Sequence, residues 1–303
     1  MTGPALGVTL PHFTDDPERM LSAARRAEAL GLDSVWVFDH LWPLSGGTHR
    51  PVIEAWTALS WLAETTQRVR VGTLVSRSTL RHPAVLAKMA ATVATIAPGR
   101  VIVGIGSGDD KSRAENEAFG LPYYSDSDRV EQLADVVATL VETTSRRFVV
   151  HRSRFASLDG LHSSPLPEPR PPVWVAGHSP AVIKLAGRVA DGWNGWGGTP
   201  RRFARAVASL DDAAGGRRVE ATWGGLAILG ASDEDAWSKV GVRDPRDYVV
   251  GGPDAVARHL SAMSAAGASH LIVTFPDAVR PDVYERLAQD VRARLDGRRA
   301  PSS

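Results

Sequence analysis

The chain has 303 residues, of which 43% are hydrophobic and 23% are charged, and a chain of this length can bury one large core. Its 35 Lys and Arg balance 34 Asp and Glu to a formal charge of +1, which argues against a nucleic acid or an anionic membrane as partner. It contains no cysteine, so disulfides, thiolate nucleophiles and sulfur-ligated zinc sites are excluded, and any redox chemistry requires a bound cofactor.

Predicted strands and helices alternate along the whole chain. In chain order, the pattern predicts the strand Leu6–Leu10, the helix Pro17–Leu30, the strand Ser34–Phe38, the helix Glu54–Thr65, the strand Val69–Val75, the helix Pro83–Ile96, the strand Val101–Ile105, the helix Arg129–Glu142, the strands Val173–Ala176, Gly192–Trp196, Thr222–Leu229 and His270–Phe275, and the helix Pro281–Leu295. Such alternation is typical of βα units around a parallel sheet. The predicted fold class is α/β, as a single (βα)8 TIM barrel with insertion segments.

The segments between these elements suggest the domain limits. The polar stretch at about residues 146–172 is rich in proline at its end and predicts a hairpin insertion before the fifth strand. We expect one catalytic domain over residues 1–296 and a disordered tail at 297–303. The first ten residues lack a signal-peptide pattern, and no stretch reaches the roughly 20 apolar residues that span a bilayer, so we expect a cytoplasmic protein.

Several motifs resemble known catalytic signatures without matching them. Gly104–Asp109 lacks the third glycine of a dinucleotide-binding loop, and Gly177–Ala181 lacks the final glycine of a nucleophile elbow. The pair Asn116-Glu117 lies about a dozen residues past a strand, away from the strand tips where glycosidase carboxylates act. The nine histidines include no closely spaced pair, so no metal site is predicted.

Side chains that can act chemically follow the predicted strands, at the end of the barrel where such enzymes keep their active sites. Asp39 and His40 follow the second strand. An imidazole can exchange a proton near neutral pH, and Asp39 could orient a neighbour or contact a cofactor. The structural alternative is that Asp39 caps a turn and that His40 is packed in the core.

The later strand ends favour a flat, phosphorylated cofactor. The third strand offers an apolar floor at Val71–Val75, and the fourth ends in the glycine-rich run Gly106–Asp109. The fifth ends at Ala176–Ser179, just before a helix whose free backbone amides could hold a phosphate. The sixth contributes Trp193 and Trp196.

A further set of segments shares a recognisable order and spacing. They are Gly31–Val37 with Asp39-His40, Arg70–Thr73 before Arg81–Ala84, Gly99-Arg100 before Gly104–Gly108, Glu115–Gly120, Pro172–Gly177 and Ala190–Trp193. Together they resemble the bacterial luciferase-like oxidoreductases, most closely the branch that uses the deazaflavin coenzyme F420. The likeness covers nearly the whole chain and implies the same luciferase-like barrel.

The resemblance implies a role for each strand end. His40 would be the catalytic acid/base residue, and Asp109 would be a second proton donor, although its side chain is shorter than the family's glutamate. Trp42 and Trp196 would line the substrate side. The implied cofactor-binding residues are Asp39, Thr73, Leu74, Val75, Ser107, Gly108, Ala176, Gly177, His178, Ser179 and Trp193.

Three further features are implied in the same way. The Leu74–Val75 peptide would be a non-proline cis bond. Arg113 could bind an anionic tail or form a salt bridge with Glu115 or Glu117, and we favour the salt bridge. Members of the family commonly dimerise, so we expect a homodimer.

These residues lead to three hypotheses of function. In the first, coenzyme F420 exchanges a hydride with a small organic substrate while His40 manages the substrate proton. In the second, the chain is an FMN-dependent monooxygenase that uses the same barrel and activates O2. In the third, the barrel only binds a cofactor or a partner. The absence of cysteine near the third strand and the segments Gly106–Asp109 and Glu115–Glu117 favour F420 over FMN.

Overall fold

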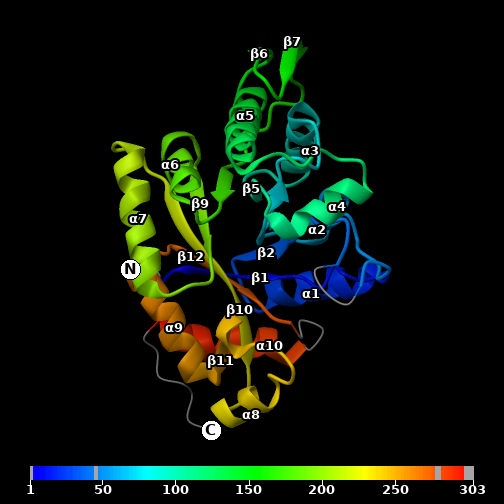
Figure 1. Cartoon of the computed structure of the whole chain (residues 1–303). Coiled ribbons are helices and arrows are strands. Elements are labelled where there is room, and N and C mark those ends of the chain that lie inside the picture. Colours follow the sequence, from blue (N-terminus) through cyan, green and yellow to red (C-terminus); the bar gives the residue numbers. More distant parts are fainter. Residues whose placement is uncertain (1–2, 44–46, 277–280, 297–303) are drawn as a thin grey trace.

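Eight parallel strands form a closed barrel in the computed structural model, which describes residues 3–43, 47–276 and 281–296 (Figure 1). They are β1 (Ala5–Thr9), β2 (Ser34–Val37), β3 (Arg70–Thr73), β5 (Val101–Gly106), β8 (Val173–Ala176), β9 (Gly192–Trp196), β10 (Glu220–Leu229) and β12 (His270–Thr274). Strand β10 pairs with β9 and with β12, and β12 pairs with β1, which closes the ring. The predicted α/β TIM barrel is therefore confirmed.

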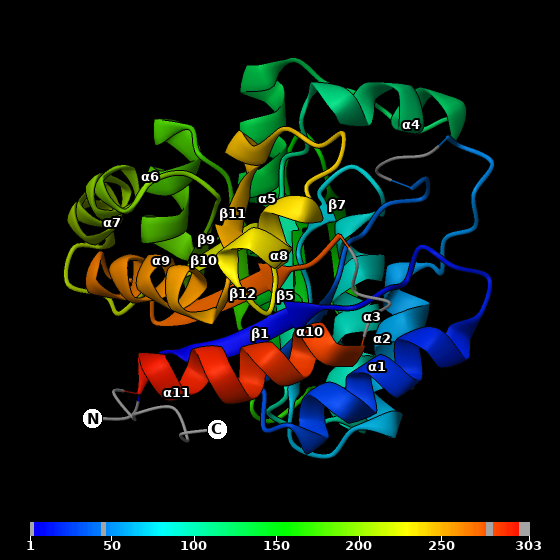
Figure 2. The ribbon, with the colours of Figure 1, turned by 90° about the horizontal axis from the view of Figure 1, so that it is seen from below.

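Helices surround the barrel and cover the outer faces of its strands (Figure 2). They are α1 (Pro17–Ala29), α2 (Ala55–Thr65), α3 (Pro83–Ile96), α5 (Asp126–Ser145), α6 (Pro180–Val189), α7 (Pro200–Ala214) and α9 (Pro253–Ala265). Most begin with a side-chain cap or a first-turn proline, and both signals can be read from the sequence. In α1, for example, Asp16 accepts a hydrogen bond from the Glu18 amide at 3.0 Å, and Pro17 occupies the first turn.

Several elements lie outside this regular pattern. They are the short strands β4 (Ser76–Arg77) and β11 (Tyr248–Gly251), the hairpin β6 (Phe148–Arg152) and β7 (Ser157–His162), and the short helices α4 (Arg113–Ala118) and α8 (Asp233–Ser238). The hairpin lies within the predicted insertion and projects from the barrel at the top of Figure 1. The sequence pattern did not predict β4, β11, α4 or α8.

The predicted C-terminal helix is a composite. It consists of α10 (Pro281–Glu285), a π-helical stretch over Arg286–Val291 and α11 (Arg292–Leu295). The tail that we expected to be disordered, residues 297–303, lies outside the described residues. Within the residues that the structure describes, none of the helices has both the length and the apolar character needed to cross a membrane.

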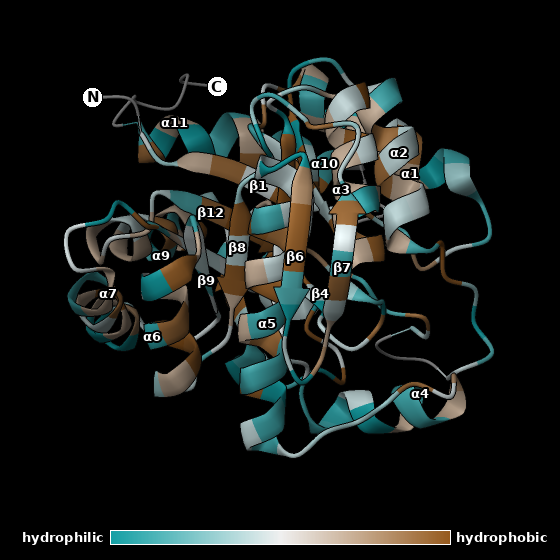
Figure 3. Cartoon of the chain, turned by 90° about the horizontal axis from the view of Figure 1, so that it is seen from above, coloured by the Kyte–Doolittle hydropathy of each residue, from teal (hydrophilic) through white to brown (hydrophobic). Residues whose placement is uncertain are grey.

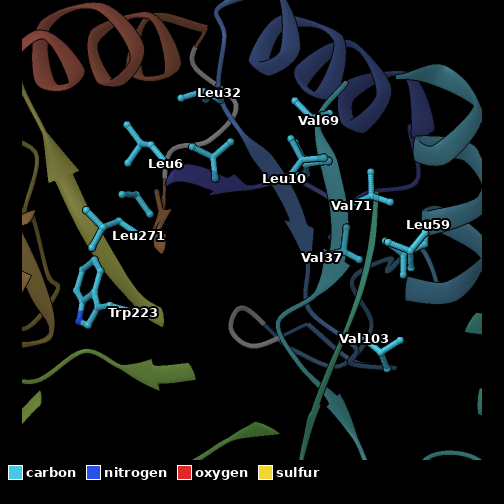
Figure 4. Packing of buried hydrophobic residues seen from close by; sticks show 14 of the residues in the cluster. Leu6, Leu10, Leu32, Val37, Leu59, Val69, Val71, Val103, Trp223 and Leu271 are labelled. Carbon is cyan, nitrogen blue, oxygen red and sulfur yellow. The ribbon is translucent and has the colours of Figure 1, made fainter. Parts of the chain in front are cut away.

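The core has two parts, one on each face of the sheet. Inside the barrel, the rings of Trp36 and Trp174 stack with centroids 5.3 Å apart and pack with Ile102 and Ile272. Outside it, alternate strand residues face the helices, as Figure 4 shows for Val71 beside Leu59 of α2. Strand β8 is coloured as hydrophobic in Figure 3, and its first three residues are buried, as expected for a barrel strand that is covered on both faces.

Candidate active site

The segment that follows β2 carries an imidazole with a defined partner. The side chain of His40 is 22% exposed, and its Nδ1 lies 2.9 Å from Oε2 of Glu115, a buried residue of α4. The other carboxylate oxygen, Oε1, accepts hydrogen bonds from the backbone amides of Leu41 and Trp42. One carboxylate thus contacts three successive residues after the strand.

A buried arginine neutralises the same carboxylate. Arg77 of β4 is 4% exposed, and its guanidinium lies 2.8 Å from Oε1 of Glu115 and donates to Oδ1 of Asn116 at 2.9 Å. Burial by itself raises the pKa of Glu115, but the hydrogen bonds from His40 and Leu41 and the charge of Arg77 bring it below its ordinary value. Glu115 is therefore ionised at neutral pH.

This arrangement overturns one prediction. The expected salt bridge from Arg113 to Glu115 or Glu117 is absent from the described part of the chain, because Glu115 pairs with His40 and Arg77. The Arg113 guanidinium lies instead over the ring of Tyr123, 4.4 Å from its centroid.

Asp39, the residue before His40, belongs to a second ion-pair cluster. It is 0% exposed, and Arg81 donates to both of its carboxylate oxygens, at 2.6 and 3.0 Å. Arg81 also pairs with Glu54, whose side chain caps the start of α2. Of the interpretations that the sequence left open for Asp39, this geometry corresponds to the orientation of a neighbour, and its contact with a cofactor stays a prediction.

A second histidine, His12, lies past the end of β1 and was not singled out in the sequence analysis. Its ring is buried and packs against Phe13 and Phe38, with centroids 4.3 and 6.1 Å away. Burial lowers its pKa to about 4, against the opposing effect of the Leu10 and Phe38 carbonyl groups, so the ring is neutral. Its Nε2 is buried and has no hydrogen-bond partner among the described residues.

The apolar floor follows β3. The peptide between Leu74 and Val75 is cis, as the resemblance implied. Thr73, also predicted to bind the cofactor, is buried and donates its hydroxyl to the Gly104 carbonyl at 2.8 Å. A Cβ on Gly104 would lie 2.0 Å from the Thr73 carbonyl oxygen, so the glycines of β5 serve the close packing of two strands.

The residues after β5 form a capped turn. The Asp109 carboxylate accepts from the amide of Ser112 at 3.1 Å and from its hydroxyl at 2.9 Å, which caps the 3-10 turn Asp110–Ser112. The hydroxyl of Ser107 donates to the Gly108 carbonyl at 3.3 Å. Asp109 therefore has a structural partner in addition to its predicted role in proton transfer.

The loop from Ala176 to Ser179 leads into α6 as predicted. Ser179 caps the helix by accepting from the Val182 amide at 3.3 Å. The pKa of His178 is lowered, first by burial and then by the charge of Arg202, which brings a cation to this helix terminus. Backbone amides that point out of the first helical turn and a nearby guanidinium are suited to a phosphate group.

The three tryptophans of the site have different environments. Trp193 is buried, and its indole donates to the Gly177 carbonyl at 2.9 Å, so it supports the loop from below. Trp196 is half-buried, with its ring 6.0 Å from that of Phe38. Trp42 contacts Phe119, the residue that follows α4, at the same centroid distance of 6.0 Å. Within the described ranges there is no group of three side chains that could hold a metal ion.

The comparisons with known proteins place this chain in a family. A family model described as luciferase-like monooxygenase matches residues 2–300. The chain belongs to this family. An F420-dependent glucose-6-phosphate dehydrogenase of Beutenbergia cavernae is 31% identical to this luciferase-like chain, over 93% of the chain and 94% of the relative.

Two further matches agree with this assignment. An F420-dependent glucose-6-phosphate dehydrogenase of Kineococcus radiotolerans is 37% identical over 58% of the chain, a match that spans only 52% of that relative. A solved structure of an F420-dependent secondary alcohol dehydrogenase with an F420-acetone adduct has a TM-score of 0.83 at 20% identity, and the match covers 97% of the luciferase-like chain and 99% of the other. The latter similarity establishes the shared fold.

Four residues of the luciferase-like site had not been assigned a role from the sequence. They are His12, Arg77, Arg81 and, as the partner of His40, Glu115. Arg77, Arg81 and Glu115 each pair with a residue that is distant in the sequence, and His12 packs against Phe38. The one available signal was the presence of Arg81 and Glu115 in the segments that carry the family resemblance.

Proposed function

We propose that this luciferase-like protein is an oxidoreductase that uses coenzyme F420 to exchange a hydride with a small organic substrate that carries a hydroxyl group. One observation carries the proposal: a half-buried imidazole, His40, and a cationic helix terminus at Ala176–Ser179 both follow barrel strands at their carboxyl ends. Its support from the comparisons is a nearly full-length relative that is an F420-dependent dehydrogenase.

The residues present fit such a cofactor. The amides at the start of α6, together with Arg202, offer a site for a phosphate, and His12 Nε2 is a buried polar atom that lacks a protein partner in the described structure. The residues that would hold the cofactor are Asp39, Thr73, Leu74, Val75, Ser107, Gly108, Ala176, Gly177, His178, Ser179 and Trp193. When bound, the deazaflavin accepts or supplies the hydride.

Within this proposal, His40 exchanges the hydroxyl proton of the substrate. Its side chain is partly exposed and keeps one ring nitrogen, Nε2, outside the contact with Glu115. Asp109 is the weaker candidate for proton transfer because its carboxylate caps a turn. Trp42 and Trp196 are proposed to line the substrate pocket.

Titration of the purified protein with F420 and with FMN tests the cofactor assignment. We expect tighter binding of F420, and the variant Arg202→Gln should weaken that binding by roughly 10-fold because it removes a charge next to the proposed phosphate site. Arg201→Gln is the matched control, since Arg201 is the adjacent residue on the same helix and is exposed like Arg202. Tighter binding of FMN, together with O2 uptake during turnover of reduced FMN, would favour the monooxygenase hypothesis instead.

A homodimer and a cytoplasmic location are also part of the proposal. The neighbouring helices α2 and α3 expose Trp61 (43%), Val85 and Ile96, and the last two lie about three turns apart on one face of α3. We expect Trp61→Glu to convert the dimer to a monomer in sedimentation equilibrium. Trp237→Glu, on the exposed surface of α8, should leave the dimer intact. A wild-type protein that sediments as a monomer would contradict the proposed dimer, and cell fractionation checks the location.

A further inference from the structure

We propose that Glu115 is the positioning residue for His40, and that its carboxylate holds the imidazole in the tautomer that carries its proton on Nδ1. This inference rests on the proposed role of His40 as the acid/base residue. It assigns to α4, which the sequence analysis did not predict as a helix, a direct part in the proton chemistry.

The two oxygens of the Glu115 carboxylate have separate tasks. Oε1 is occupied by the amides of Leu41 and Trp42 and by the guanidinium of Arg77, which lies 2.8 Å away. Oε2 is left to the imidazole, 2.9 Å from Nδ1 of His40. Because the glutamate side chain is only 6% exposed, water does not replace these partners easily.

The tautomer follows from the charge of the carboxylate. An ionised carboxylate has no hydrogen to donate, so a hydrogen bond between it and Nδ1 requires the hydrogen to be on Nδ1. In the neutral ring, Nε2 then carries a lone pair and can accept a proton. Nε2 is therefore the atom through which His40 would exchange the substrate proton.

The other charged groups around His40 are already paired or neutral. Asp39 from the end of β2 is bound by Arg81, and His12 from the end of β1 is uncharged at neutral pH. Arg77 from β4 and Asp109 from the turn after β5 interact with each other's charge, and Arg77 also pairs with Glu115. Glu115 is thus the acid in hydrogen-bond contact with the imidazole.

Contacts within α4 and just past its end hold it in place. Asn116 accepts from Arg77 at 2.9 Å and donates to the hydroxyl of Thr79 at 2.9 Å. At the end of the helix, the ring of Phe119 packs against Trp42. Glu115 is therefore held by its helix as well as by its own hydrogen bonds.

The substitution Glu115→Gln should change the tautomer of His40 without disturbing the fold. The amide oxygen can keep the bonds of Oε1, while the amide NH2 group takes the place of Oε2 and donates to Nδ1, which favours the tautomer with hydrogen on Nε2. Nitrogen-15 NMR of the imidazole, assigned by comparison with His40→Ala, should show hydrogen on Nδ1 in the wild type and on Nε2 in the variant. Glu117→Gln makes the same chemical change at an exposed position of α4 and should leave the wild-type pattern.

Kinetics provide a second readout. We expect Glu115→Gln to lower kcat by about 10- to 100-fold with little change in F420 affinity, as for loss of a group that orients a catalytic side chain. In the direction of substrate oxidation, the acid limb of the pH–kcat profile should move to lower pH, because the amide has no charge to stabilise the imidazolium. Glu115→Asp, which restores the carboxylate, should recover part of the rate and return the limb toward its wild-type position.

The outcomes separate this inference from the proposed function. The NMR experiment needs no cofactor, so it decides the role of Glu115 even if F420 fails to bind. A wild-type ring with hydrogen on Nε2, or the same tautomer in the wild type and in Glu115→Gln, would overturn the proposal. So would a loss of kcat without any movement of the acid limb, because that result indicates a merely structural role.

Discussion

Replacement of His40 by alanine is expected to lower kcat by about 10²- to 10⁴-fold, the range typical of loss of a general acid or base. The half-buried ring of His40 has a single defined contact, with Glu115, and no other imidazole of the described site has both partial exposure and a fixed carboxylate partner. The cofactor residues proposed at the ends of β3, β5 and β8 are untouched by this change. F420 affinity, measured by titration, should therefore remain within about twofold of the wild type.

The control for this prediction is His162→Ala. His162 lies on the exposed hairpin strand β7, away from the strand ends that form the site. Its removal should leave kcat and cofactor affinity unchanged. Full turnover in His40→Ala would remove His40 from the mechanism, and the absence of turnover in the wild type with any cofactor would favour the hypothesis of a barrel that only binds.

The largest effect on stability is expected from Arg81→Leu. This change leaves the carboxylate of Asp39, which is 0% exposed, without the guanidinium that binds both of its oxygens. Removal of one partner of a buried ion pair costs about 3–5 kcal/mol, because the remaining charge stays desolvated. We expect a clear decrease in the midpoint of unfolding by guanidinium chloride, followed by circular dichroism.

An exposed ion pair provides the comparison. Arg25 pairs with Glu18 at 2.6 Å, but the two side chains are 51% and 63% exposed, so Arg25→Leu should cost only about 0–1 kcal/mol. The double variant Asp39→Asn with Arg81→Leu should recover part of the lost stability, since it also removes the unpaired negative charge of Asp39. Equal midpoints for Arg81→Leu and Arg25→Leu would show that Asp39 does not depend on Arg81.

Local signals predicted the barrel strands and most of the helices around them, although α7 and α9 were given no predicted limits. The observed limits of α3, β8 and β9 match the predicted limits, and α3 displays its start in Pro83. The helix α5 is longer than predicted because Ser125 caps it, four residues before the expected start at Arg129. The short elements α4 and β11 were missed, since six and four residues contain too little periodicity to distinguish a helix or a strand from a loop.

The predicted site residues follow the barrel strands, but several have partners that the sequence did not indicate. The indole N–H of Trp193 donates to the carbonyl of Gly177, and the hydroxyl of Thr73 donates to the carbonyl of Gly104. Asp109 caps a turn. The local sequence predicts that a residue lies at the end of a given strand. Which atom its side chain then contacts depends on how the other strands pack around it.

The sequence by itself determined the α/β barrel and the residue types at the strand ends. It could do so because caps, glycine stops and apolar periodicity are interactions among residues close in the chain. Only the tertiary structure decided that Glu115 meets His40 and that Arg81 holds Asp39, pairs that are 75 and 42 positions apart. Such contacts exist because closure of the barrel brings the loops after β2, β4 and β5 to the same end. A local sequence pattern cannot predict contacts between residues so far apart in the chain.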